Sequence, residues 1–158
     1  MLSRKAEDYL EAILNIEEKK GYTRINDIAL AFNVKPSSVV EMVKRLDDRG
    51  CVNYRKYDGV TLTPKGAEIG RAVWGRHTTI RAFLEIIKVP EPTADKDACI
   101  IEHELESKTI EQIRNLVDFV KSAPDYPQWL EHFEVFCKTG VHPCVEEKRK
   151  GKGHRLSS

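Results

Sequence analysis

The most constraining feature of this chain is the stretch of residues 24–63, where two helical patterns are followed by an alternating one. Apolar residues recur at helical spacing over residues 24–32, and the Asn33-Val34 pair interrupts them. A second helical pattern covers residues 35–50 and begins next to Pro36, which is favoured in the first turn of a helix. Two helices joined by a turn of about four residues predict a helix-turn-helix.

After this pair of helices, the apolar pattern changes to the two-residue period of strands. The alternating apolar residues are Val52, Tyr54, Val60 and Leu62. Asp58-Gly59 between them is typical of a tight hairpin turn. Arg55, Lys56 and Lys65 make the hairpin basic. A helix-turn-helix followed by a basic hairpin predicts a winged helix, in which one helix enters the major groove of DNA and the wing reaches phosphates.

The rest of the chain is predicted to be mainly helical. We expect a first helix over residues 4–19, ended by Gly21, and further helices over residues 64–88, 95–105 and 109–122. The last two are amphipathic and too few to bury their apolar faces alone, which favours dimerisation. Residues 124–144 are expected to be irregular or weakly helical, and the basic segment 145–158 to be a flexible tail.

One cluster, Cys99-x-x-Glu102-His103, predicts a transition-metal site. On a helix these three positions share one face, so that a thiolate, a carboxylate and an imidazole would converge. Sulfur together with nitrogen and oxygen suits Fe(II), Zn(II) or Co(II), whereas Mg²⁺ and Ca²⁺ prefer oxygen alone. Asp8 and Glu11 share a face in the same way. The alternative for the cluster alone is an exposed helix with ordinary charges.

Bulk composition neither supports nor excludes a nucleic-acid partner. Lys and Arg number 26 against 25 Asp and Glu, a net charge of +1, so the distribution of charge must carry that argument. The sequence has no apolar run of membrane-spanning length, and its first residues lack the apolar core of a signal peptide. We therefore expect a cytoplasmic protein without a membrane partner. Four widely spaced cysteines show no disulfide-scaffold pattern.

Five motifs in register resemble a known family. They are Glu7-Asp8-Tyr9-Leu10-Glu11, Lys35-Pro36-Ser37-Ser38-Val39, Leu62-Thr63-Pro64-Lys65-Gly66, Arg76-His77 and Cys99-x-x-Glu102-His103. Between residue 4 and about residue 121 the chain resembles the metal-dependent transcriptional repressors of the diphtheria toxin repressor and manganese transport regulator family. The resemblance implies a winged-helix domain over residues 1–70, followed by an all-helical metal-binding and dimerisation domain over residues 71–144.

The resemblance also implies a paired-metal site, with features of both branches of the family. The implied metal ligands are Asp8, Glu11, His77, Cys99, Glu102 and His103, with Glu102 bridging two ions. Manganese-type members carry glutamate at position 99, and iron-type members carry cysteine there but methionine at position 8. Iron-type ancillary positions are Arg81 and Lys96 here, which cannot ligate while charged. Because the thiolate disfavours Mn(II), we expect Fe(II) first and Mn(II) second, with Zn(II), Co(II) or Ni(II) as possible surrogates.

The function implied is repression of metal-uptake genes by a homodimer on operator DNA, without catalysis. Ligands in both domains would let the metal fix the spacing of the two recognition helices across two half-sites. The expected DNA contacts lie at the start of the recognition helix, farther along it and in the wing. They are Lys35, Ser37, Ser38, Glu41, Lys44, Arg45, Arg55 and Lys56.

Three alternatives remain open from the sequence. A winged-helix regulator that ignores metal would bind DNA equally with and without a chelator. An enzyme with a di-metal carboxylate centre would need Glu-x-x-His motifs on facing helices, and the chain has no such pair. A spacing of H-x4-C-x4-H-x-C, formed by His132, Cys137, His142 and Cys144, suggests a small zinc site, although incidental surface thiols fit the pattern better.

Overall fold

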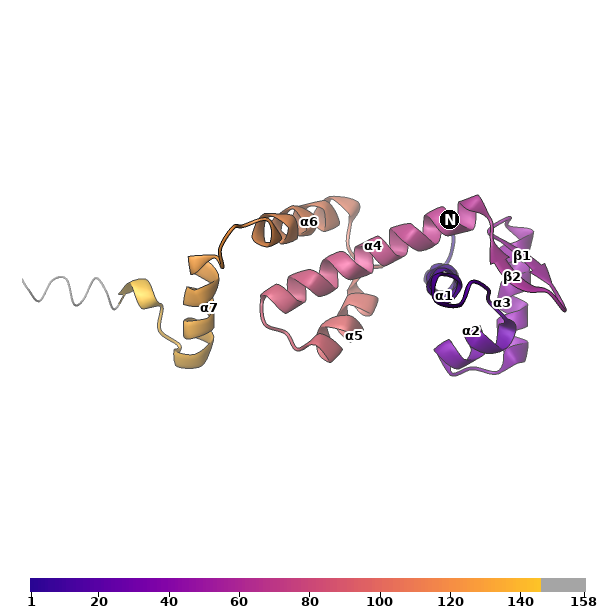
Figure 1. Ribbon diagram of the computed structural model, residues 1–158, viewed down its shortest axis with the longest axis horizontal. Helices are drawn as coiled ribbons and strands as arrows, with labels where there is room; N and C mark the ends of the chain where they lie inside the picture. The colour runs from indigo at the N-terminus through magenta and orange to yellow at the C-terminus, as the bar shows by residue number, and fades with distance from the viewer. Residues whose placement is uncertain (146–158) are drawn as a thin grey trace, which may run out of the picture. The chain divides into compact units, whose positions relative to one another are not determined.

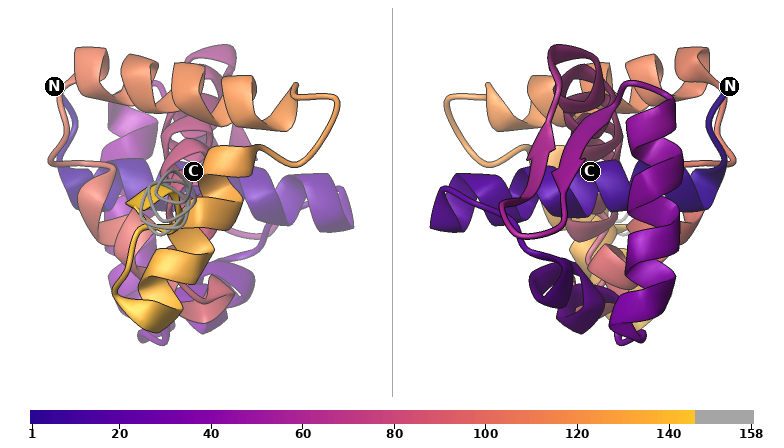
Figure 2. Two further views of the ribbon diagram at one scale, coloured as in Figure 1. Left: turned by 90° about the vertical axis from the view of Figure 1, so that its left-hand side faces the viewer. Right: turned by 90° about the vertical axis from the view of Figure 1, so that its right-hand side faces the viewer.

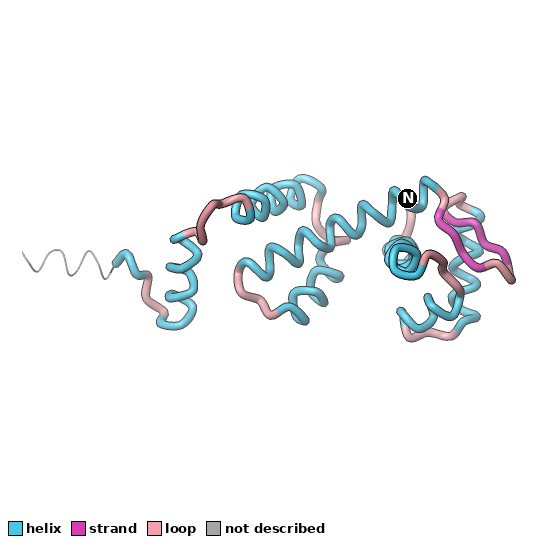
Figure 3. Tube along the Cα trace, in the orientation of Figure 1, coloured by secondary structure: helices cyan, strands magenta, loops and turns pink. Residues whose placement is uncertain are grey.

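The computed structural model describes residues 1–145, which are mainly helical apart from one hairpin (Figures 1 and 3). The elements are α1 (Arg4–Lys20), α2 (Ile25–Phe32), α3 (Pro36–Asp48), β1 (Val52–Arg55), β2 (Gly59–Leu62), α4 (Pro64–Ile86), α5 (Glu91–Ile101), α6 (Ser107–Lys121) and α7 (Gln128–Thr139). The chain forms two compact units, residues 1–114 and the residues from Asn115 onward. In the described range, no helix combines the length and the apolar character needed to cross a membrane.

Helices α2 and α3 form the predicted helix-turn-helix. Asn33 ends α2 in the left-handed conformation, with φ 51°, which short polar side chains tolerate better than most. Pro36 occupies the first turn of α3, where its missing N–H costs nothing. The apolar face of α3 is buried through Val39, Val43 and Leu46, so its opposite face lies at the surface. The helix-turn-helix expected from the sequence is confirmed.

The predicted wing is also confirmed. Strands β1 and β2 pair antiparallel, with Val52 opposite Leu62 and Arg55 opposite Gly59, and α3 packs beside β1 (Figure 2, right). Gly59 has φ 100°, which favours glycine, and a side chain there would also meet the backbone oxygen of Thr23. The N–H of Val60 donates to that oxygen at 2.9 Å. The hairpin is therefore anchored to the segment between α1 and α2.

Helix α1 packs against α4, and this contact joins the winged helix to the elements that follow it (Figure 1). The Ser3 side chain caps α1, and Thr63 caps α4 in the same way. Gly70 lets the helices approach closely, because a Cβ there would lie 2.9 Å from the Leu10 carbonyl oxygen. Gly66 is tighter still, with a Cβ only 1.8 Å from the Cys51 carbonyl oxygen. Alanine does not fit at Gly66 unless backbone moves.

We expect Gly66→Ala to destabilise the protein strongly. The new methyl group must displace the backbone at Cys51, and overpacking of this kind costs about 1–3 kcal/mol or more. Gly75→Ala in the same helix is a matched control, because nothing lies within 4 Å of its added Cβ. It should stabilise by about 0.5–1 kcal/mol through helix propensity. Urea unfolding of both variants measures the difference, and equal midpoints would contradict the steric argument.

Two elements in the second half differ from the sequence expectation. Helix α5 begins at Glu91 and ends at Ile101, rather than covering residues 95–105, because Pro92 is accommodated in its first turn. Glu102 caps the helix, and His103 lies in the turn after it. Residues 128–139 form the regular helix α7, ended by Gly140 at φ 71°, where an irregular or weakly helical segment was expected. The basic tail lies almost wholly outside the described residues.

Candidate metal centre

The six predicted metal ligands come from four places in the first compact unit. Helix α1 carries Asp8 and Glu11, and α4 carries His77. Cys99 lies in the last turns of α5, while Glu102 and His103 follow at its end. Apolar packing holds α5 against α4, since Ala98 of α5 and Ile80 of α4 belong to one buried cluster. The α5 terminus is thereby fixed beside the α4 face that carries the histidine.

Glu102 lies at the middle of this group. Its side chain is fully buried, with 0% exposure, and its Oε2 accepts a hydrogen bond from Nδ1 of His77 at 3.1 Å. Its other oxygen, Oε1, is 3.1 Å from Nε2 of His103. The same His103 nitrogen is 2.7 Å from Oδ1 of Asp8. One carboxylate therefore contacts both histidines, and α1 reaches the group through Asp8.

Three of these atoms are buried without a hydrogen-bond partner. They are Oδ1 of Asp8, Oε1 of Glu102 and Nε2 of His103, which lie within 4.8 Å of one another at distances but not angles suited to hydrogen bonds. A buried polar atom without a partner costs about 1–3 kcal/mol, so three together need a common explanation. Two carboxylate oxygens and an imidazole nitrogen are suitable ligands for a divalent transition metal. The donor set fits a cation.

His77 joins the group through its two ring nitrogens. Besides the bond to Glu102, its Nε2 lies 3.0 Å from Oδ1 of Asp95, and the ring stacks on Trp74. The hydrogen bond to Glu102 is the main cause that raises the pKa of His77 to about 9. An imidazolium between two carboxylates therefore neutralises negative charge here, and a metal ion that binds His77 must displace a proton.

Glu11 and Cys99 line a cavity of about 590 Å³ together with Asp8, His77 and Asp95. Burial, and then the charge of Glu102, raises the pKa of Glu11 to about 7. Partial burial and the same carboxylate also raise the pKa of the Cys99 thiol, although this residue reaches the surface. Both side chains therefore lie close enough to Glu102 to respond to its charge. The concentration of negative charge favours a cation at this cavity.

Sequence reasoning missed the residues that support the group. Glu7 lies 3.3 Å from Nδ1 of His103 and accepts a hydrogen bond from Arg76 at 3.3 Å, so it orients the imidazole. Arg4 donates to the carbonyl oxygens of Cys99 and Ile100 at 3.2 and 3.1 Å. Asp95 precedes Cys99 by four residues, a spacing that puts both on one helix face. That spacing was the available signal for Asp95.

The predicted DNA contacts all lie at the surface of the winged helix. Lys35 precedes α3, and Ser37 and Ser38 lie in its first turn. Farther along α3, Glu41 and Arg45 form an ion pair, and in the wing Arg55 lies 3.8 Å from Asp58. The complete exposed set is Lys35, Ser37, Ser38, Glu41, Lys44, Arg45, Arg55 and Lys56. The exposed face of α3 and the wing carry five positive charges from this set.

Comparisons with known families place two domain models on the chain. Residues 1–60 match the model described as the N-terminal DNA binding domain of the iron dependent repressor. Residues 63–130 match the metal binding and dimerisation domain of the same repressor.

Individual proteins give the same picture. The chain is 42% identical over 125 residues to the HTH-type transcriptional regulator MntR of Lysinibacillus sphaericus, covering 79% of this chain and 90% of that protein. The MntR of Listeria welshimeri is 41% identical over 129 residues, covering 82% of this chain and 91% of that protein. The crystal structure of T. acidophilum IdeR matches with TM-score 0.63 and 26% identity, covering 77% of this chain and 55% of that one. The structure of the manganese regulator SloR matches with TM-score 0.64 and 27% identity, covering 75% and 56%.

Proposed function

The chain belongs to the iron-dependent repressor family of metal-dependent transcriptional repressors, and we propose that it represses metal-uptake genes as a homodimer on operator DNA when Fe(II), or second Mn(II), is bound. The observation that carries the proposal is the convergence of three unpartnered ligand atoms, one from α1 and two from the end of α5. We propose no catalytic role and a cytoplasmic location. Residues 1–70 would bind DNA, and residues 71–144 would bind metal and dimerise.

Six residues would hold two metal ions in this proposal. They supply three carboxylates, one thiolate and two imidazoles, and both ions would share Glu102. The residues are Asp8, Glu11, His77, Cys99, Glu102 and His103. The buried position of Glu102 between both histidines supports the shared role. When bound, the cations supply the positive charge that lets these acidic side chains stay close together. Without it, Asp8, Glu11 and Glu102 repel one another, and this repulsion adds to the effect of burial, which is the main cause of the raised pKa of Glu11.

Residue 99 supports the preference for iron. Mn(II) stands at the weak end of the order of divalent metal affinities and gains least from a thiolate, whereas Fe(II) gains more. Among the similar structures, SloR is described as a manganese regulator, which is a statement about that protein. The cysteine at position 99 of this chain is the reason to propose Fe(II) first, with Zn(II), Co(II) and Ni(II) as surrogates.

The proposed switch acts through the position of α1. Arg4 and Arg76 already connect α1 to the α5 end and to α4 without metal. These arginine contacts are partly exposed and are therefore weak. Ligation by Asp8 and Glu11 would add a strong connection, because both belong to α1 and thus to the winged helix. The metal then favours one arrangement over the others, which is a shift in population.

For DNA, we propose that Ser37 and Ser38 reach base edges or phosphates at the start of α3, and that Lys35, Lys44 and Arg45 contact phosphates. The wing would add Arg55 and Lys56. Glu41 is a candidate to accept from cytosine N4, but it must first leave its ion pair with Arg45. Since that pair is exposed, breaking it costs little.

We expect a homodimer built from the helices around residues 98–120. Within this range Ile100, Leu116 and Phe119 expose 50, 38 and 64% of their surface, and a partner chain would cover this apolar area. Light scattering at micromolar concentration should give twice the chain mass of 18.1 kDa, with or without metal. A monomer under both conditions would contradict the proposed assembly.

The test of the function is DNA affinity measured under anaerobic conditions against Fe(II), Mn(II), Co(II) and Zn(II), with a chelator as the metal-free reference. An operator-containing fragment from upstream of the gene is the probe, and an unrelated fragment is the control. We expect metal to tighten specific binding by at least tenfold, with Fe(II) active at a lower free concentration than Mn(II). Equal binding with and without chelator would instead support a metal-independent winged-helix regulator.

A further inference from the structure

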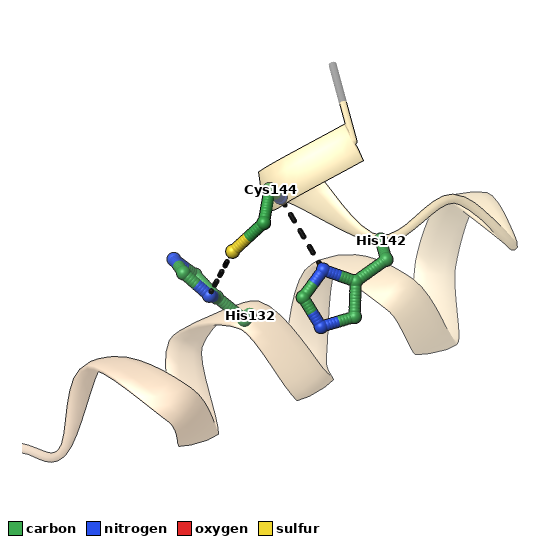
Figure 4. A group of neighbouring side chains, drawn as sticks. All are labelled: His132, His142 and Cys144. Atoms are coloured by element: carbon green, nitrogen blue, oxygen red, sulfur yellow. Dashed lines mark hydrogen bonds between the residues drawn. The ribbon is translucent and has the colours of Figure 1, made fainter. Parts of the chain in front are cut away.

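A second group of metal-ligating side chains lies in the second compact unit, around the end of α7. His132 belongs to α7, and His142 and Cys144 follow the helix (Figure 4). Sγ of Cys144 is 3.4 Å from Nδ1 of His132, and the two imidazole rings are 5.8 Å apart between centroids. One ligand atom from each of the three residues lies within 4.8 Å of the others. His132 is ten or more residues away from His142 and Cys144 in the sequence, so the turn after α7 brings the three side chains together.

Local hydrogen bonds build that turn. Gly140 ends α7 in the left-handed conformation, and its N–H donates to Phe136 O at 2.8 Å. The N–H of Val141 donates to the Thr139 hydroxyl at 3.2 Å, and the N–H of Val145 donates to the carbonyl of His142 at 3.0 Å. These bonds turn the chain back along the helix. As a result, Cys144 returns to His132, twelve residues earlier.

Both imidazoles direct their Nδ1 atom at Cys144. Nδ1 of His142 accepts a 3.3 Å hydrogen bond from the N–H of Cys144, and Nδ1 of His132 faces the thiol. A neutral imidazole has one such lone pair, and this lone pair is what binds a metal. A thiolate and two neutral imidazoles are the protonation states that zinc requires. A bound cation would therefore replace the thiol proton of Cys144 and the two contacts of 3.3 and 3.4 Å that Cys144 makes with the imidazoles.

We propose that His132, His142 and Cys144 form a metal site for Zn(II) or a similar thiophilic divalent ion. For tetrahedral zinc, with Zn–S about 2.3 Å and Zn–N about 2.0–2.1 Å, sulfur and nitrogen ligands lie about 3.5 Å apart. The observed 3.4 Å matches this separation. Three protein ligands leave the fourth position to water. The donor set contains no carboxylate, so it differs in chemistry from the group around Glu102 and does not rest on the proposed function.

Cys137, the remaining member of the sequence pattern, is not part of this site. It follows His132 by five residues on the same helix, which places it about 140° around the helix axis. It is exposed and absent from the group of neighbouring ligand atoms. Cys137 therefore offers a matched control for Cys144, since both are accessible thiols within one short segment.

Cobalt substitution tests the site in the full chain. Co(II) bound by a thiolate gives a near-ultraviolet charge-transfer band, and tetrahedral Co(II) gives strong visible bands. Because Cys99 supplies a thiolate elsewhere, the test uses a Cys99→Ser background. We expect both bands to persist in this background, to survive the added Cys137→Ser and to disappear with Cys144→Ser. Zinc retained after dialysis should fall by one ion per chain only in the Cys144→Ser variant.

His142→Ala gives a second route that keeps all three remaining cysteines of the background. It should lower zinc affinity at least tenfold while circular dichroism shows unchanged helix content. Absence of the thiolate band in the Cys99→Ser background would overturn the proposal. So would its persistence after Cys144→Ser, or its equal loss with Cys137→Ser.

Discussion

Glu102→Ala is expected to abolish most of the metal-stimulated gain in DNA affinity, and to cost more than Asp8→Ala or Cys99→Ala. Glu102 is fully buried and contacts His77 and His103 through different oxygens, whereas Asp8 contacts His103 and Cys99 borders the cavity. In the proposed site this shared carboxylate would serve two ions, so its removal would also leave the like-charged cations less screened. We expect a loss above the roughly 10- to 100-fold typical of residues that support metal ligands.

The comparison needs controls for folding, because Glu102 is buried. Glu102→Gln keeps the shape of the side chain and removes its charge, so it separates lost packing from lost ligation. Glu104→Ala removes an exposed carboxylate two residues away, whose contact is a surface pair with Arg4 at 3.4 Å. It should leave the metal response within about twofold, as expected for a weak surface pair. If Glu102→Ala responded to metal as well as Asp8→Ala does, the bridging role would be removed.

Much of the DNA-binding half could be predicted because its signals are local. The break at Asn33, the proline at the start of α3 and the hairpin turn at residues 56–58, followed by Gly59, each act within a few residues. Their order along the chain then determines a helix-turn-helix with a wing. The wing's anchor to Thr23 was not predictable, because that contact joins segments far apart in the sequence.

The metal-centre half was harder because its boundaries depend on packing. Glu102 caps α5, whereas the sequence predicted that the helix continues through it. The helical spacing still predicted correctly that Glu102 and His103 lie close together. Glu7 carries no pattern that separates it from ordinary surface acids, and the only signal for Asp95 is its four-residue spacing from Cys99. Only the tertiary structure shows that they touch the rings of His103 and His77.

Helix α7 illustrates a different limit. Its proline-flanked segment contains aromatic residues that favour a helix only weakly, so single-sequence propensity suggested irregular structure. In the structure, Pro127 precedes the first turn and Gly140 follows the last, which are favourable positions for both residues. The residues at the two ends of the segment therefore indicated a helix more clearly than the residues inside it. The same Gly140 turn returns Cys144 to His132, a contact that the uncommon spacing of ligands concealed.

Cys99→Glu is expected to move the metal preference from Fe(II) toward Mn(II). The thiol lies at the surface end of the cavity that Glu11, His77 and Asp95 also line, so the longer carboxylate has room. A thiolate favours iron and cobalt but gives Mn(II) little, and a carboxylate reverses this balance. The raised pKa of the Cys99 thiol does not change this balance, because either ion must displace the same proton to bind the thiolate.

The measured quantity is the ratio of Fe(II) to Mn(II) activation constants for DNA binding, determined anaerobically. We expect Cys99→Glu to change this ratio at least tenfold in favour of Mn(II), even where the altered geometry lowers affinity for both ions. Cys99→Ser is the matched control, since it removes the thiolate without adding a carboxylate and should weaken iron activation while leaving manganese nearly unchanged. A general loss of fold or of DNA contact weakens activation by both metals together. Only a specific role of residue 99 therefore changes the ratio of the two activation constants. An unchanged ratio in Cys99→Glu would mean that selectivity is determined by Asp8, Glu11 and the histidines, and that the thiolate is not a ligand that discriminates between metals.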